Sequence, residues 1–135
     1  MYKNILVPLA FDEEHKPDAA MNAVRALASE GAKVTLVHVM ADVPGYAMSY
    51  MPPGYTDELK TTLQSSLDSL AKDFGGAATI LTEGSPANEI LRIADENGVD
   101  CVVIASHRPG FGDYLIGSTA ARVVRHAHCS VLVLR

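Results

Sequence analysis

The chain has 135 residues, of which 48% are hydrophobic and 20% charged, and it carries a formal net charge of −5 at pH 7. This length fits one domain, residues 1–135, with a proper core, and the composition excludes a wholly disordered chain. An acidic chain without a lysine or arginine cluster does not suit a nucleic-acid surface. No apolar run approaches the roughly 20 residues that span a bilayer, so we expect no membrane partner.

The cysteines and the N-terminal segment indicate a cellular compartment. Cys101 and Cys129 lie in or beside apolar runs, so we interpret them as reduced core residues rather than as a disulfide or a metal pair. The N-terminal residues lead directly into an apolar run and lack the pattern of a signal peptide. We therefore expect a cytoplasmic protein.

The first half of the chain predicts two strands and one helix. An apolar run at 5–9 predicts a strand, and apolar residues at helical spacing over 17–30 predict a helix that Gly31 ends. The β-branched run at 33–39 predicts the second strand. Residues 42–56 contain three prolines and two glycines, which indicates a long loop.

The second half continues the alternation of helices and strands. A stripe of leucines predicts a helix over 57–74, and Ser85 and Pro86 open another helix that Gly98 closes. A final helix is predicted over 117–127. The remaining apolar runs predict strands at 79–82, 101–105 and 130–134.

Five strands alternating with four helices predict an α/β fold. It is a single doubly wound, five-stranded parallel sheet of Rossmann-like type, with the strand order 3-2-1-4-5. Such sheets bind ligands beyond the carboxyl ends of their strands, where the order reverses. The predicted lining therefore comprises residues 9–12, 39–42, 82–84 and the segment that begins at 105.

The segment between the fourth strand and the last helix carries the clearest chemical signal. Three of its residues are glycines, and it ends in Gly117, Ser118 and Thr119 at the predicted start of the helix. Small residues let backbone N–H groups approach an anion, and a helix N-terminus adds partial positive charge. Ser118 and Thr119 either donate to a phosphate or cap the helix, and we favour both roles together.

Several blocks of the chain resemble the universal stress protein family, and most of all the short single-domain members of its F-like branch. They are residues 4–8 (NILVP), 36–39 (LVHV), 83–91 (EGSPANEIL), 104–109 (IASHRP) and 117–133. The resemblance implies a homodimer formed through the C-terminal strand, 130–134, and binding of an adenine nucleotide: ATP, ADP or AMP. It implies Mg²⁺ only with ATP, and it identifies neither a protein partner nor a catalytic residue or metal site.

The residues that the resemblance assigns to the nucleotide lie in and around the predicted crevice. They are Pro8, Leu9, Ala10, Val39, Ile104, Ala105, His107, Arg108, Gly117, Ser118 and Thr119. The family's pattern, Gly-x2-Gly-x9-Gly-Ser/Thr, departs here, because its first two glycines fall on Ala105 and Arg108 and the loop is one residue shorter. The usual acidic residue after the first strand falls on Ala10.

These departures leave alternatives open. One is a stress protein without nucleotide binding that acts through protein contacts of its tyrosine- and methionine-rich loop; that loop could equally form a lid or pack on the fold. Another is a slow ATPase or autophosphorylating protein, although no general base is evident. A flavodoxin-type carrier suits the fold but lacks its early phosphate loop. We interpret His38 as a structural histidine, and Ser106 with His107 as no catalytic pair.

Overall fold

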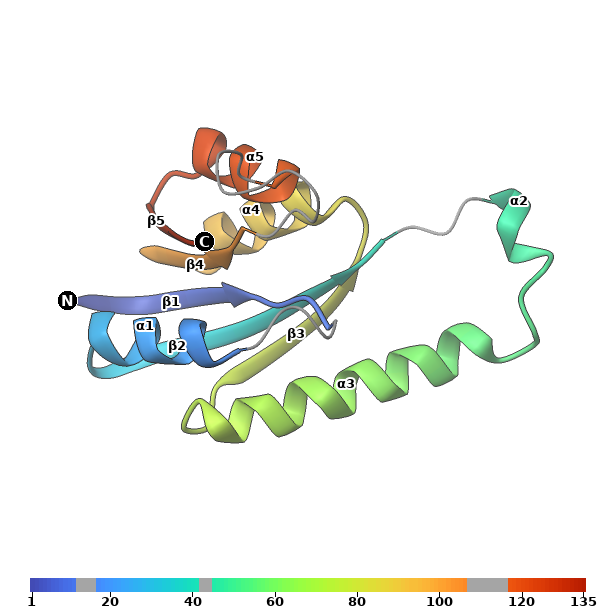
Figure 1. Cartoon of the computed structure of the whole chain (residues 1–135), viewed down its shortest axis with the longest axis horizontal. Helices are drawn as coiled ribbons and strands as arrows, with labels where there is room; N and C mark the ends of the chain where they lie inside the picture. The colour runs from blue at the N-terminus through green and yellow to red at the C-terminus, as the bar shows by residue number, and fades with distance from the viewer. Residues whose placement is uncertain (12–16, 42–44, 107–116) are drawn as a thin grey trace.

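The computed structural model of the chain describes residues 1–11, 17–41, 45–106 and 117–135. Its centre is a five-stranded sheet with the order β3-β2-β1-β4-β5, in which every pair of neighbouring strands is parallel (Figure 1). The predicted fold class and strand order are therefore confirmed.

The elements alternate along the chain as expected. The strands are β1 (Tyr2–Pro8), β2 (Ala28–Met40), β3 (Ala78–Glu83), β4 (Cys101–Ala105) and β5 (Ser130–Leu134). The helices are α1 (Asp18–Leu27), α2 (Gly45–Met48), α3 (Tyr55–Asp73), α4 (Pro86–Glu96) and α5 (Ser118–His126). The predicted bounds of the last two strands are confirmed to the residue.

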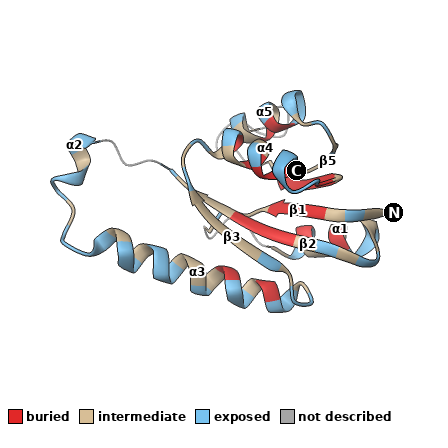
Figure 2. Cartoon of the chain, turned by 180° about the vertical axis from the view of Figure 1, so that it is seen from behind, coloured by how far each residue is buried: buried red, intermediate tan, exposed pale blue. Residues whose placement is uncertain are grey.

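The sheet forms the middle of three layers, with α4 and α5 on one face and α1 and α3 on the other (Figure 1). Side chains of β1 alternate between two cores: Leu6 faces α4 and α5, while Ile5 and Val7 face α1 and α3. All three are fully buried, and the buried stretches of β1, β2 and β4 mark the centre of the sheet in Figure 2. Coverage on both faces explains why these strands are continuous apolar runs.

Two local predictions are wrong. Gly31 does not end the first helix, because α1 stops at Leu27 and the chain already pairs with β1 at Ala28, opposite Tyr2. Gly31 instead lies inside β2, where its φ of 74° is one that glycine adopts readily. The loop predicted at 42–56 contains the short helix α2, so the described part of the chain has five helices rather than four.

Residues 45–55, which we call the arm, project from the fold. Figure 1 shows α2 beyond the N-terminal end of α3, away from the sheet. Tyr46 and Tyr50 are 79% and 87% exposed, so these two side chains of the arm do not pack on the described part of the fold. The buried residues of α3, Leu67 and Ala71, belong to the half that lies over the sheet.

Both cysteines are free thiols, as expected. Cys101 is buried within β4, and burial raises the pKa of its thiol to about 11. Partial burial also raises the pKa of Cys129, which packs against the opposite face of the sheet. Among the described helices, none is both long and apolar enough to cross a membrane.

Asp100 fixes the beginning of β1 from the neighbouring connection. Its two carboxylate oxygens accept the backbone N–H groups of Lys3 and Asn4 at 2.9 and 3.0 Å. These bonds, with the one to Lys3 the largest cause, hold the pKa of Asp100 below its ordinary value. The bonds help to align β1 beside β4.

Replacing Asp100 by asparagine should lower the free energy of unfolding at pH 7 by about 1–2 kcal/mol, because one N–H loses its acceptor and the charge is removed. The ionised form stabilises the fold above the unfolded-state pKa of about 3.9, and this contribution disappears as the pH falls through the lower folded-state value. Urea denaturation should therefore show that the difference in free energy of unfolding between wild type and Asp100→Asn becomes smaller at acidic pH. Asp73→Asn, at an exposed position, is the control and should leave stability unchanged at both pH values.

Candidate functional site

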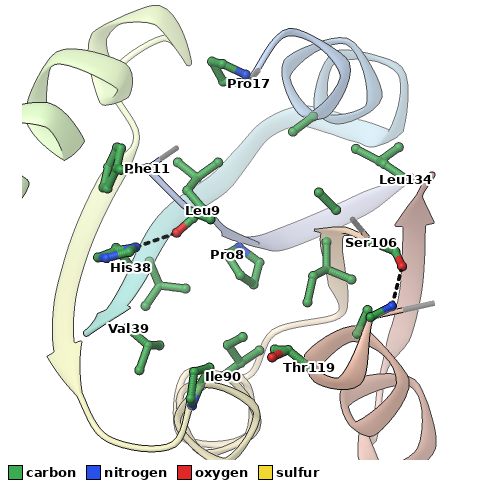
Figure 3. A pocket seen from close by; sticks show the side chains of 18 of the residues that line it. Pro8, Leu9, Phe11, Pro17, His38, Val39, Ile90, Ser106, Thr119 and Leu134 are labelled. Carbon is green, nitrogen blue, oxygen red and sulfur yellow. Dashed lines mark hydrogen bonds between the residues drawn. The ribbon is translucent and has the colours of Figure 1, made fainter. Parts of the chain in front are cut away.

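A pocket of about 790 Å³ opens beyond the carboxyl ends of the central strands (Figure 3). The ends of β1, β2, β4 and β5 contribute to it, together with the beginnings of α1, α4 and α5. Its lining consists of Pro8, Leu9, Ala10, Phe11, Pro17, Ala19, Ala20, Val37, His38, Val39, Leu70, Pro86, Ile90, Ile104, Ala105, Ser106, Gly117, Ser118, Thr119, Ala120, Leu134 and Arg135.

The structure brings the predicted site residues together as far as it describes them. The ones that line this single pocket are Pro8, Leu9, Ala10, Val39, Ile104, Ala105, Gly117, Ser118 and Thr119. His107 and Arg108 lie outside the described residues. Whether any of these side chains binds a ligand stays a prediction.

The chain leaving β1 is held against β2 at one wall of the pocket. The Leu9 N–H donates to Val37 O at 2.8 Å, and the Leu9 carbonyl oxygen lies 2.7 Å from His38 Nδ1. Because a carbonyl oxygen can only accept, Nδ1 carries the proton in this contact. The ring of Phe11 then packs on His38 with centroids 4.9 Å apart, as the labelled side chains in Figure 3 show.

His38 is therefore a structural histidine with a backbone partner, as the sequence indicates. The sequence did not indicate that the same residue also lines the pocket. Its neighbours Leu9, Phe11 and Val39 give this wall an apolar, partly aromatic surface. Such a surface suits a flat organic ring.

The opposite wall begins at α5 and is rich in donors. Gly117 is the N-cap, and the residues after it, Ser118, Thr119 and Ala120, form the first turn. Backbone N–H groups in a first turn have no intrahelical acceptor, and a glycine N-cap has no side-chain oxygen to offer them. The helix therefore presents donors and hydroxyl groups to the pocket where its dipole is positive.

Gly117 is not required here for an unusual backbone conformation. Its φ of −61° and ψ of 155° are accessible to every residue. A glycine here leaves the start of the helix without a side-chain cap. Its own N–H is used within the protein, since it donates to Ser106 Oγ at 2.8 Å.

Two predicted parts of the lining are wrong. From the predicted range 39–42, Met40 and Ala41 do not line the pocket, while Asp42, like Asp12 of the range 9–12, lies outside the described residues. Residues 82–84 do not line the pocket, because β3 lies at the far edge of the sheet and the beginning of α4 takes that place. Thr82 donates instead to Glu89 Oε1 at 2.7 Å, and Arg92 holds the other oxygen of the same carboxylate. The hydrogen bond from Arg92 is the largest cause, and that from Thr82 the next, of a pKa of Glu89 that is lowered to about 2.

Other lining residues were missed for two reasons: some come from helices, which the strand-end rule does not cover, and some lie at the end of β5, to which the rule was not applied. Leu70 and Ile90 belong to helices that pack over the crevice, while Leu134 and Arg135 end the edge strand. Helical periodicity could have marked Ile90 as inward-facing, but not as pocket-facing. The signal for Leu134 and Arg135 was available, because β5 also ends at this edge of the sheet.

The arrangement combines an apolar half with a half that is rich in hydrogen-bond donors. It fits a small molecule that has a planar ring at one end and a negatively charged group at the other. Within the described residues, no group of three or more histidine, cysteine or acidic side chains is placed to hold a metal ion.

A family model and a curated relative both match this chain to the same protein family. The family model described as "Universal stress protein family" matches residues 1–135. Universal stress protein G of Escherichia coli O157:H7 is 31% identical over 145 residues, covering 100% of both chains.

Solved structures share the fold over nearly the whole chain. The structure of the hypothetical protein MJ0577 has a TM-score of 0.80 at 26% identity, covering 99% of this chain and 96% of that one. A universal stress protein in complex with cAMP has a TM-score of 0.63 at 22% identity, covering 99% and 97%. One from Archaeoglobus fulgidus in complex with dAMP has a TM-score of 0.61 at 23% identity, covering 99% and 98%.

The contact between His38 and Leu9 generates a test of the pocket wall. His38→Phe keeps an aromatic ring but leaves the Leu9 carbonyl without its partner, so the free energy of unfolding should fall by about 1–2 kcal/mol. Chemical denaturation measures the change. His126→Phe, at an exposed position on the end of α5, is the control and should shift stability little. Equal stability of wild type and His38→Phe would show that this bond does not hold the wall.

Proposed function

This chain belongs to the universal stress protein family, and from the pocket described above we propose that it binds an adenine nucleotide as a sensor or regulator in the stress response. The observation that carries the proposal is the uncapped start of α5 facing an apolar wall within one pocket. A nucleotide has the matching two ends, a flat base and an anionic phosphate.

The two walls assign the two ends of the ligand. The base would lie against Leu9 and Val39. The phosphate would lie beside Gly117, where the N–H and O–H groups of Ser118 and Thr119 can donate to its oxygens. The cavity volume is within the range of small-molecule sites, about 300–1,000 Å³. Proteins of the same fold have been solved with cAMP and with dAMP, which supports the same ligand class.

The number of phosphates is a separate part of the proposal. The described lining residues include no acidic side chain, so Mg²⁺ would enter with a triphosphate and be held by its oxygens. AMP needs no such ion, which makes it the simplest probe of the site. ATP with and without Mg²⁺ then measures how many phosphates the site prefers.

Gly117→Asp should separate folding from binding. Aspartate is a favourable N-cap, so the fold should be as stable as wild type or slightly more stable, but its side chain would occupy the first-turn N–H groups and repel phosphate. We expect AMP affinity to fall at least tenfold, about 1.4 kcal/mol or more, by isothermal titration calorimetry.

The matched control is Gly45→Asp, which adds the same charge at the first residue of α2, outside the pocket, where a new Cβ meets nothing within 4 Å. It should bind AMP like wild type. Unchanged AMP affinity in Gly117→Asp would contradict the placement of the phosphate.

We also propose that two copies associate through β5. This strand is an edge of the sheet, and its residues 131–134 are apolar and partly exposed. The carbonyl of Leu134 accepts from Ser106 N, so the backbone of Leu134 faces β4 and that of Val133 faces outward. Free outward N–H and C=O groups of this kind pair readily with a second strand.

Val133→Pro should therefore convert a dimer into a monomer, because proline removes an outward N–H while an edge strand tolerates it. Val133→Thr is the control, since it keeps the β-branched shape and the N–H. Sedimentation velocity at micromolar concentration measures both, with circular dichroism to confirm folding. A folded Val133→Pro protein that remains dimeric would contradict pairing through β5.

The arm supports a second candidate, action through protein contacts. Tyr46 and Tyr50 are largely exposed, and none of the residues 45–55 lines the pocket, which favours an interaction surface over a lid. If the β5 variants leave the dimer intact, Tyr50→Ser would test whether the arm forms it. The two free thiols support a reducing compartment, the cytoplasm, for either candidate.

A further inference from the structure

Ser106 occupies a junction between three parts of the site. It directly follows β4 and lines the pocket, and its hydroxyl oxygen accepts the Gly117 N–H at 2.8 Å (Figure 3). Its own backbone N–H donates to Leu134 O at 2.7 Å. One residue thereby connects the start of α5 to both β4 and the edge strand β5.

The hydrogen bond between Ser106 and Gly117 is made at the N-cap of α5, the residue directly before the first turn of the helix. Gly117 has no side chain to pack, and its backbone angles are accessible to any residue, so little in the residue itself fixes its direction. The Ser106 hydroxyl supplies a fixed acceptor one residue before the first turn. A phosphate bound by N–H groups needs those groups held in place beforehand, because ordering them on binding weakens affinity.

The beginning of α4 lacks the support that Ser106 gives to α5. The beginning of α4 also reaches the pocket, but its first residue, Pro86, has no N–H to offer. Its N-cap, Ser85, makes no side-chain cap bond and has no acceptor comparable to Ser106. Of these two helix starts, α5 is the one that combines donors with an external anchor.

We propose that Ser106 is a positioning residue for the phosphate: it holds Gly117 so that the first turn of α5 presents its N–H groups to the ligand. The inference rests on the proposed nucleotide binding. Ser106 acts through Gly117 and is not itself assigned a contact with the phosphate. Its backbone bond to Leu134 makes the same anchor continuous with the edge strand.

The experiment compares Ser106→Ala and Ser106→Thr with wild type, using AMP and adenosine as probes in calorimetry. Alanine removes the acceptor but keeps the backbone bond to Leu134, whereas threonine keeps the hydroxyl. We expect Ser106→Ala to bind AMP about tenfold more weakly, to bind adenosine as wild type does, and Ser106→Thr to restore AMP affinity. A residue that only maintained the fold would weaken both probes together.

Amide hydrogen exchange of Gly117, measured by NMR without ligand, tests the anchor directly. Exchange should be slow in wild type and Ser106→Thr and faster in Ser106→Ala. Equal AMP affinity of wild type and Ser106→Ala, or equal losses for AMP and adenosine, would overturn the role of Ser106 while leaving the nucleotide proposal intact. A wild-type protein that binds neither AMP nor ATP would overturn the proposed function and this inference with it.

Discussion

The reversal of strand order around β1 is the constraint on which the rest of the structure depends. From β1 the chain proceeds through β2 to β3 on one side, then returns to add β4 and β5 on the other. The helix that follows β1 therefore covers one face, while the helix that follows β4 covers the opposite face. The two connections diverge, and the space between them is the pocket. The burial of Ile5, Leu6 and Val7 keeps β1 in the central position that this arrangement requires.

Element bounds could be predicted most reliably where a single physical requirement, such as burial on both faces, determines the residues of a segment. The bounds of β4 and β5 follow from continuous apolar runs between polar flanks, because a strand covered on both faces has no other pattern available. The end of α1 was misjudged for a different reason. Gly31 carries a strong local helix-stop signal, but Ala28 pairs with Tyr2 across the sheet, and this pairing between distant segments stops the helix earlier. Helix propensity depends on the local sequence alone and does not take such long-range contacts into account.

The site divides in the same way. Backbone-dominated parts could be predicted, because strand ends and a Gly-Ser-Thr helix start are placed by topology and by local chemistry. Side chains that reach the pocket from helices, such as Leu70 and Ile90, depend on how α3 and α4 pack, which a single sequence does not specify. His38 shows both cases. Its structural role was predicted, but its place in the pocket wall could be recognised only once the position of Leu9 was known.

The burial of Cys101 has a consequence for oxidative chemistry. Thiols react with peroxides and disulfides as thiolates, and burial raises the pKa of the Cys101 thiol to about 11, which keeps it protonated at pH 7. Cys129, on the other face of the sheet, also has a raised pKa. Both sulfurs should therefore resist the first step of the oxidation ladder, formation of a sulfenic acid, under conditions that would oxidise an exposed, activated cysteine. The sheet thus shields one cysteine on each of its faces.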